Sequence, residues 1–133
     1  MAEWVSSLLR RSIAHLEDEV PQSYRVLVTT LGSLVVQLDV DGEVFALRGG
    51  DRLRVSNGTA PGAGVRIATS RLAVLDLIDA RVGLGEAVEA GMVRVHGSLD
   101  DVQRVHDALQ AYVHAAVRAS SQPALLSRLR AAS

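Results

Sequence analysis

The sequence predicts an α+β fold in which helices cover a sheet, and three observations lead to this class. Apolar residues recur at three- and four-residue steps near both ends of the chain, as in amphipathic helices. The middle of the chain is rich in β-branched residues and is interrupted by glycine-containing turns, which is typical of strands. With 133 residues the chain has the length of one ordinary domain, so we expect a single domain over residues 1–133.

The first predicted element is an N-terminal helix over residues 3–20. Pro21 predicts its end, because proline cannot donate the backbone hydrogen bond that would continue a helix. The apolar positions that define this helix are Trp4, Val5, Leu8, Leu9, Ile13, Leu16 and Val20.

Strands are predicted in the β-branched region that follows. The pair "DG" at Asp41 and Gly42 supplies the positive backbone angles of a tight hairpin turn. The carboxylates of Asp39 and Glu43 then belong to this turn, since the further oxygen ligands of a calcium loop are missing at the required offsets. The predicted strands cover residues 24–30, 34–40, 43–48, 52–56 and 65–69.

The second half of the chain returns to helices. Ser70 is placed to cap a helix through its hydroxyl, and a short helix in "GLGEAVEAG" and a strand in "MVRVH" follow. Ser98 and Asp101 resemble a capping box at the start of a long helix, which completes a sheet-and-helix core over residues 24–118. A C-terminal helix is predicted over residues 122–132.

Composition excludes several classes of function. The net charge of -1 is unsuited to non-specific nucleic-acid binding, and we expect no nucleic-acid partner. The chain has neither lysine nor cysteine, which excludes Schiff-base chemistry, disulfides and thiolate metal sites. The apolar runs are far shorter than a membrane span, so we expect no stable membrane insertion and a cytoplasmic location. We also expect no cofactor.

The histidines do not predict a catalytic or metal site. Side chains alternate along a strand, so if Val93 and Val95 point into the core, His96 points to solvent. His106 and His114 are eight residues apart on the long helix, whereas two adjacent ligands on one helix need a spacing of about four. We therefore predict no catalytic residue and no metal.

The block "GVRIATSRLAVLDLIDARVGLGEAVEAGMVRVHGS", residues 64–98, resembles the sterol carrier protein type 2 family. "LVVQLDVDGEVFALRGG" is similar to the first hairpin of that family, so the resemblance covers about residues 30–118. Where many members carry a glycine after the first of the two helices, this chain has Ala80. The features of the block that carry the resemblance are Ile67, Ser70, Leu77 with Ile78, Ala87 with Val88, Gly91, Val93, Val95 and Gly97.

The resemblance implies an SCP2-like fold with a mixed, mostly antiparallel sheet of five or six strands, covered by helices. It also implies a hydrophobic tunnel that binds or transfers a lipid, such as a fatty acyl chain, a sterol-like molecule or a polyketide-like molecule. A bacterial, stand-alone, non-catalytic carrier is the expectation. The predicted tunnel walls are Val36, Leu38, Phe45, Leu47, Val65, Ile67, Val74 and Ile78, with Leu125, Leu126 and Leu129 as a possible lid.

Other interpretations remain open at this point. Arg48, Arg52 and Arg54 are candidates to bind a carboxylate or phosphate head group, since guanidinium groups bind such anions bidentately, or they are simply solvated. The same apolar cavity would also suit an enzyme of secondary metabolism that acts by positioning its substrate. A third interpretation is an accessory or oligomerisation module. For the C-terminal helix three roles stay open: covering the tunnel mouth, forming a homodimer or contacting a membrane.

Overall fold

A single five-stranded sheet lies at the centre of the architecture. The computed structural model describes residues 4–131, and the strand order is β3-β2-β1-β4-β5. Neighbouring strands are antiparallel except for β1 and β4, which run parallel, so the predicted mixed, mostly antiparallel sheet is confirmed with five strands. The strands are β1 (Val35–Val40), β2 (Glu43–Arg48), β3 (Arg54–Asn57), β4 (Val65–Thr69) and β5 (Arg94–Gly97).

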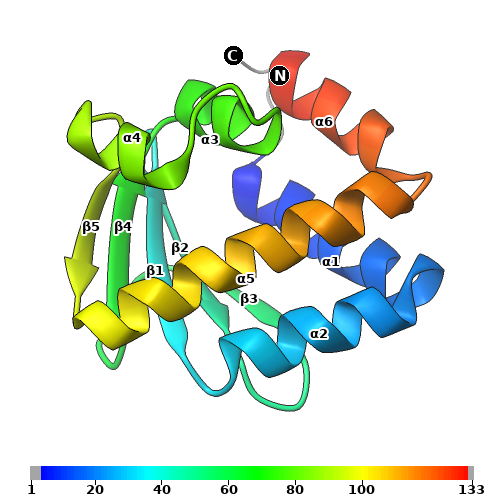
Figure 1. Cartoon of the computed structure of the whole chain (residues 1–133), viewed down its shortest axis with the longest axis horizontal. Helices are drawn as coiled ribbons and strands as arrows, with labels where there is room; N and C mark the ends of the chain where they lie inside the picture. Colours follow the sequence, from blue (N-terminus) through cyan, green and yellow to red (C-terminus); the bar gives the residue numbers. More distant parts are fainter. Residues whose placement is uncertain (1–3, 132–133) are drawn as a thin grey trace.

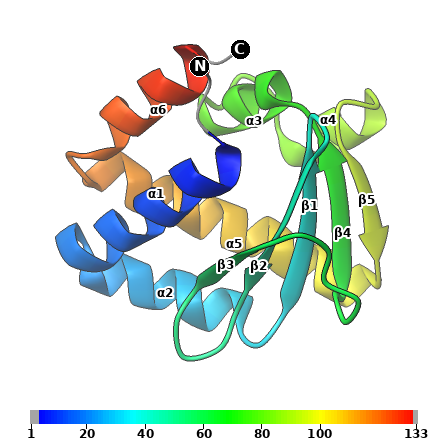
Figure 2. The same cartoon turned by 180° about the vertical axis from the view of Figure 1, so that it is seen from behind.

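Helices cover one face of this sheet and extend beyond it (Figures 1 and 2). The long α5 crosses in front of the strands, α2 runs alongside it, and α1 lies behind both in the view of Figure 1. The helices α3 and α4 lie over the end of the sheet at which β4 ends and β5 begins. The helices are α1 (Val5–Glu19), α2 (Pro21–Leu31), α3 (Arg71–Ile78), α4 (Leu84–Glu89), α5 (Leu99–Arg118) and α6 (Gln122–Ala131).

The strand predicted over residues 24–30 is wrong, because this segment is the helix α2. Pro21 follows the end of the first helix, α1, as predicted, but it also occupies the first turn of α2, where a missing N–H costs nothing. Tyr24, Leu27 and Leu31 are buried at helical spacing, which packs α2 against α5 and overrides the strand propensity of the β-branched residues. The helix ends at Gly32, whose φ of 62° suits glycine.

The observed ends of other helices and strands differ slightly from the predicted ends. The first helix begins at Val5 and the last ends at Ala131, and residues 3 and 132, which the predictions also covered, lie outside the described residues. The strand predicted from residue 52 begins only at Arg54, since the backbone N–H of Leu53 donates to the hydroxyl of Tyr24 at 3.1 Å instead of pairing in the sheet.

The predicted serine caps are confirmed at both later helices. The hydroxyl of Ser70 accepts a hydrogen bond from the N–H of Ala73 at 3.1 Å, at the start of α3. The hydroxyl of Ser98 accepts one from the N–H of Asp101 at 3.2 Å, at the start of α5. Each cap satisfies one backbone donor that the helix itself leaves unpaired.

The hairpin between β1 and β2 fixes the position of two helices. Asp41 and Gly42 have φ values of 53° and 89°, which confirms the predicted tight turn. Glu43 accepts hydrogen bonds from the N–H groups of Val5 and Ser6 at 2.7 and 3.0 Å, and Asp41 accepts one from the N–H of Arg71 at 2.9 Å. The carboxylates of this turn therefore hold the first turns of α1 and α3.

The alternation of side chains divides the sheet into an apolar inner face and a polar outer face. His96 and its register partner Arg66 are both exposed on the outer face, as the parity argument predicts for His96. On the inner face, four consecutive register partners form an apolar row across four strands: Phe45, Leu38, Ile67 and Val95. This row faces the helices and forms the base of the site described next.

Candidate functional site: an apolar cavity between sheet and helices

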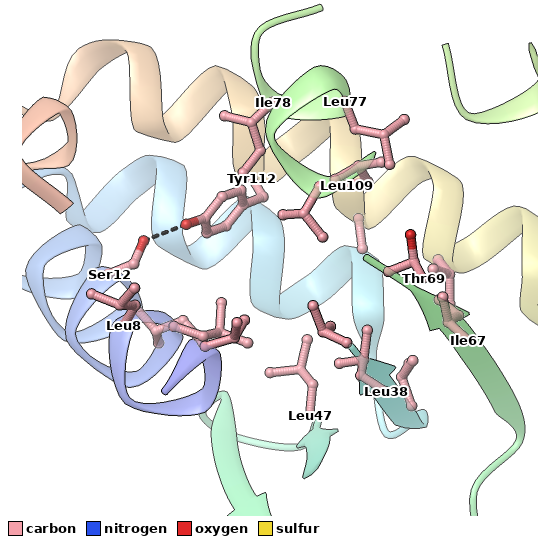
Figure 3. A pocket seen from close by; sticks show the side chains of 18 of the residues that line it. Leu8, Ser12, Leu38, Leu47, Ile67, Thr69, Leu77, Ile78, Leu109 and Tyr112 are labelled. Carbon is pink, nitrogen blue, oxygen red and sulfur yellow. Dashed lines mark hydrogen bonds between the residues drawn. The ribbon is translucent and has the colours of Figure 1, made fainter. Parts of the chain in front are cut away.

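A cavity of about 250 Å³ lies between the inner face of the sheet and the helices (Figure 3). It is larger than the apolar cavities of about 150 Å³ that hold benzene, and it approaches the range of about 300–1,000 Å³ typical of ligand pockets. Its thirty lining residues include no aspartate, glutamate, arginine or histidine. Such a cavity has the shape and chemistry to hold an apolar molecule.

The structure brings together ten of the eleven side chains that the sequence predicts as walls. In Figure 3, Leu38, Leu47 and Ile67 rise from the sheet toward Ile78, which comes from α3. Val65 is the exception, because it is fully buried in the core with Leu34 and Val36 and does not line the cavity. The ten are Val36, Leu38, Phe45, Leu47, Ile67, Val74, Ile78, Leu125, Leu126 and Leu129.

The sequence predictions missed the walls contributed by α1, α2 and α5. The spacing of apolar residues in the first and long helices predicts an apolar stripe but does not tell a packed core from a cavity wall. The residues from α2 were missed because that segment was expected to be a strand. The missed apolar residues on these helices are Val5, Leu8, Leu9, Ile13, Leu27, Leu31, Val102, Val105, Ala108 and Leu109.

One polar network lies at the helical end of the cavity. Ser12 of α1 donates a hydrogen bond to the Oε1 atom of Gln122 at 2.6 Å, and Gln122 returns one from Nε2 to the backbone oxygen of Ser12 at 3.3 Å. The hydroxyl of Tyr112 bonds to the same Ser12 Oγ, as the dashed line in Figure 3 shows. Because the proton of Ser12 goes to Gln122, Tyr112 is the donor of this bond.

Burial explains the electrostatics of this network. Ser12 and Gln122 are each only 4% exposed. Burial raises the pKa of Tyr112, and the hydrogen bond with Ser12 only partly opposes this shift. Tyr112 is therefore a neutral phenol at neutral pH, and it joins α5 to α1 and α6 through Ser12.

Thr69 is the fourth polar residue of the lining, on the sheet side of the cavity. It is the last residue of β4, and its hydroxyl donates to the backbone oxygen of Met92 at 3.0 Å. This bond ties the end of β4 to the segment that leads into β5. No sequence signal singled out Thr69, Ser12, Tyr112 or Gln122 as site residues.

The candidate head-group arginines lie outside this cavity. Arg48 is exposed at the end of β2 and donates to the hydroxyl of Ser56 at 3.1 Å. Arg52 forms an ion pair with Glu17 at 2.6 Å, which raises the pKa of Arg52. Arg54, the register partner of Arg48, is exposed.

Arg52 and Arg54 line a second recess of about 270 Å³ between α1, α2 and β3, which contains charged as well as apolar side chains. Arg10 also lines it and is held by Asn57, whose Oδ1 atom accepts its hydrogen bond at 2.8 Å. Two apolar residues, Ile13 and Leu53, are common to the linings of the recess and of the apolar cavity. The two spaces are therefore neighbours, and only the recess has charged side chains in its lining.

The helix α6 closes one side of the cavity and is fastened at both ends. Leu125, Leu126 and Leu129 contribute to the lining. At the first turn, Gln122 bonds to α1 as described above, and near the last turn Arg130 donates two hydrogen bonds of 2.7 Å to the carboxylate of Asp79, which follows α3. The helix therefore bridges α1 and α3.

Two kinds of feature were not found within residues 4–131. No group of three or more histidine, aspartate or glutamate side chains is arranged to hold a metal ion there. In the same part of the chain, no helix has the length and apolar character needed to cross a membrane.

The sheet order, the covering helices and the cavity between them define the SCP2-like fold, the class that the sequence block at residues 64–98 predicts. Among solved structures, the chain is similar to the sterol carrier protein domain 2 of Helicoverpa armigera, with a TM-score of 0.63 and 13% identity over 86% of this chain and 95% of that one. It is also similar to a UbiJ-SCP2 ubiquinone synthesis protein, with a TM-score of 0.58 and 17% identity over 74% and 82% of the two chains.

A third similar structure is palmitated SCP2L2 from Aedes aegypti, with a TM-score of 0.57 and 18% identity over 80% of this chain and 95% of that chain. At these identities the likeness shows the fold and not the ligand. No family model matches the sequence, and no curated protein matches it.

Proposed function

We propose that this protein binds a lipid or another hydrophobic small molecule in the apolar cavity and carries it without changing it chemically. The observation that supports this most directly is the cavity itself, about 250 Å³ in volume and lined without a charged side chain. Burial of an apolar chain there would supply about 0.8 kcal/mol per methylene group, so affinity would depend on chain length more than on chain identity.

The similar structures point in the same direction. One is named as a sterol carrier domain, one as a ubiquinone synthesis protein, and one is described as palmitated. Each of these names involves a molecule with a large apolar part. The apolar row of Phe45, Leu38, Ile67 and Val95 gives this chain an apolar surface that such a molecule could contact.

The lining offers little for acid–base chemistry. Tyr112 is its only titratable side chain, and its pKa is raised, so it is poorly suited to act as a base at neutral pH. An enzyme using this cavity would have to rely on positioning its substrate. We therefore propose binding and transfer as the function.

Displacement of a fluorescent apolar probe by a series of primary alcohols tests the proposal. Affinity should rise roughly fourfold for each added methylene and then level off when the cavity is full. The substitution Leu38→Trp fills the cavity from the sheet, and Leu72→Trp makes the same change on α3 at a side chain that is 67% exposed and outside the lining. Binding should weaken in the first variant and stay unchanged in the second.

Thermal unfolding must show that both variants are folded. If folded Leu38→Trp protein binds the alcohols as well as the unchanged protein does, the ligand is not in this cavity. If no apolar probe binds to the unchanged protein, and none is found by native mass spectrometry of protein purified from its own cells, the carrier function is wrong.

A head-group role of Arg48, Arg52 and Arg54 is the alternative proposal for an anionic ligand, and it has a narrower basis. The recess beside the cavity contains Arg52 and Arg54, and an anionic group on a ligand that extends past Ile13 and Leu53 would reach them. Arg52 is already paired with Glu17, which leaves Arg54 as the better candidate. Loss of fatty-acid binding in Arg54→Ala but not in Arg48→Ala would support this role.

A further inference from the structure

The polar atoms of the cavity lining have a common property that limits which ligands the cavity can bind. Only four lining residues are polar: Ser12, Thr69, Tyr112 and Gln122. A ligand that reaches them must match the hydrogen-bonding capacity that the protein has left free. That capacity follows from an inventory of their donors and acceptors.

The protons of these four residues are all used within the protein. Tyr112 donates to Ser12, Ser12 donates to Gln122, and Thr69 donates to the backbone oxygen of Met92. The amide of Gln122 has two hydrogens, and its Nε2 atom donates to the backbone oxygen of Ser12 at 3.3 Å and to the hydroxyl of Ser121 at 3.4 Å. No side-chain donor of the lining is left for a ligand.

Acceptor capacity does remain. A hydroxyl oxygen has two lone pairs, so Tyr112 and Thr69 each keep both, and Ser12 keeps one after accepting from Tyr112. In Figure 3 the oxygen atoms of Tyr112 and Ser12 lie together at the helical end of the cavity, and Thr69 lies apart on the sheet side. The helical end thus has two adjacent acceptors.

An anion would find neither a donor nor a positive charge in this cavity. The lining contains no arginine or histidine, and the arginines of the neighbouring recess are on the far side of Ile13 and Leu53. Burying an ionised carboxylate without a hydrogen-bond donor is strongly unfavourable. A hydroxyl group, in contrast, is uncharged and brings the proton that the lining lacks.

We infer that, if the cavity binds apolar molecules as proposed above, its preferred ligands are uncharged amphiphiles whose buried polar end is a hydroxyl group that donates its single proton to Tyr112, with Ser12 as the adjacent acceptor. Tyr112 and Ser12 then act as specificity-determining residues. A fatty-acid anion is disfavoured because of its charge. An ether or ester is disfavoured because it has no proton to donate.

Three probes of similar size separate these reasons: 1-dodecanol, its isomer undecyl methyl ether, and dodecanoate, which is ionised at about pH 8. The alcohol should bind at least tenfold more tightly than dodecanoate. The ratio of alcohol affinity to ether affinity should fall about two- to tenfold in Tyr112→Phe, which is the worth of one neutral hydrogen bond. In Thr69→Val, the matched loss of a hydroxyl on the sheet side, this ratio should stay unchanged.

The comparison of the three probes in the unchanged protein does not depend on whether a variant folds. If dodecanoate binds as tightly as the alcohol, or if the alcohol-to-ether ratio is the same in folded Tyr112→Phe protein, the inference is wrong although the cavity still binds apolar molecules. Dodecanoate binding that is lost in Arg54→Ala would place the polar end in the arginine recess and would also overturn it. Failure of all three probes to bind would instead contradict the proposed function itself.

Discussion

Removal of the Glu43 carboxylate should destabilise the protein by detaching the first turn of α1 from the β1–β2 hairpin. Glu43 accepts hydrogen bonds from the N–H groups of Val5 and Ser6 at 2.7 and 3.0 Å. The residue at the N-cap position, Trp4, makes no side-chain capping bond of its own. Glu43 therefore does for this helix what an N-cap side chain does elsewhere, from a residue about forty positions away.

The expected cost can be worked out from these two bonds. Loss of a capping side chain costs about 0.5–2 kcal/mol, and hydrogen bonds to a charged group are worth about 1.5–3 kcal/mol each. Because Glu43 is only partly buried and water can replace it, we expect about 2 kcal/mol for Glu43→Ala. With an unfolding entropy near 2.1 cal/mol/K per residue, about 0.28 kcal/mol/K for this chain, the midpoint should fall by about 7 °C.

Thermal and urea unfolding, followed by circular dichroism, measure this effect. Glu43→Gln keeps one acceptor oxygen but loses the charge, so it should fall between the alanine variant and the unchanged protein. Glu89→Ala removes an exposed glutamate at the end of α4 and should change stability by less than about 0.5 kcal/mol. If Glu43→Ala is no less stable than Glu89→Ala, the capping argument is wrong.

Three further predictions concern the backbone strain at Ala80, the close backbone contact at Gly49 and the stability of the protein in acid. Ala80 has a φ of 57°, so Ala80→Gly should raise the unfolding free energy by about 1 kcal/mol; a loss of stability would contradict the strain argument. A Cβ at Gly49 would lie 2.0 Å from a backbone oxygen, so Gly49→Ala should cost at least about 2 kcal/mol, whereas Gly62→Ala, which has open space, should be nearly neutral, and equal costs would refute the contact. Hydrogen bonds from Ser121 hold the pKa of Glu19 below its ordinary 4.5, so the stabilising effect of the Glu19 carboxylate is present above that pH and lost as the pH falls through the lowered pKa. In Glu19→Gln the urea unfolding midpoint should therefore depend less on pH between about pH 5 and pH 3. An unchanged pH dependence of the midpoint would count against this role of Glu19.

Local patterns predicted most of the fold. Apolar spacing located the first and long helices, serine placement located two helix starts, and "DG" located the hairpin. The segment at residues 24–30 misled the prediction, because β-branched residues favour strands locally while Leu27 and Leu31 are buried against distant residues of α5. The positive φ of Ala80 had an indirect signal in the family resemblance, in which many members carry a glycine after the first of the two helices.

The candidate site was predictable where the sheet, α3 and α6 line it, and it was missed where α1, α2 and α5 line it. Strand parity follows directly from sequence, so residues such as Leu38 and Phe45 were identified as wall residues before the sheet was known. The bond network of Ser12, Tyr112 and Gln122 joins residues about a hundred positions apart. A polar residue in an apolar stripe gives no indication of which distant partner it will meet, and nothing local identifies these three.

The two fastenings of α6 differ in how they respond to their surroundings. The Arg130–Asp79 pair is half exposed on the arginine side, so added salt would weaken it, whereas the bonds of Gln122 are buried and insensitive to ionic strength. High salt should therefore weaken the attachment of the far end of this helix more than that of its near end. If the cavity binds a ligand as proposed, the dwell time of that ligand should then shorten with ionic strength even if its equilibrium affinity stays nearly constant.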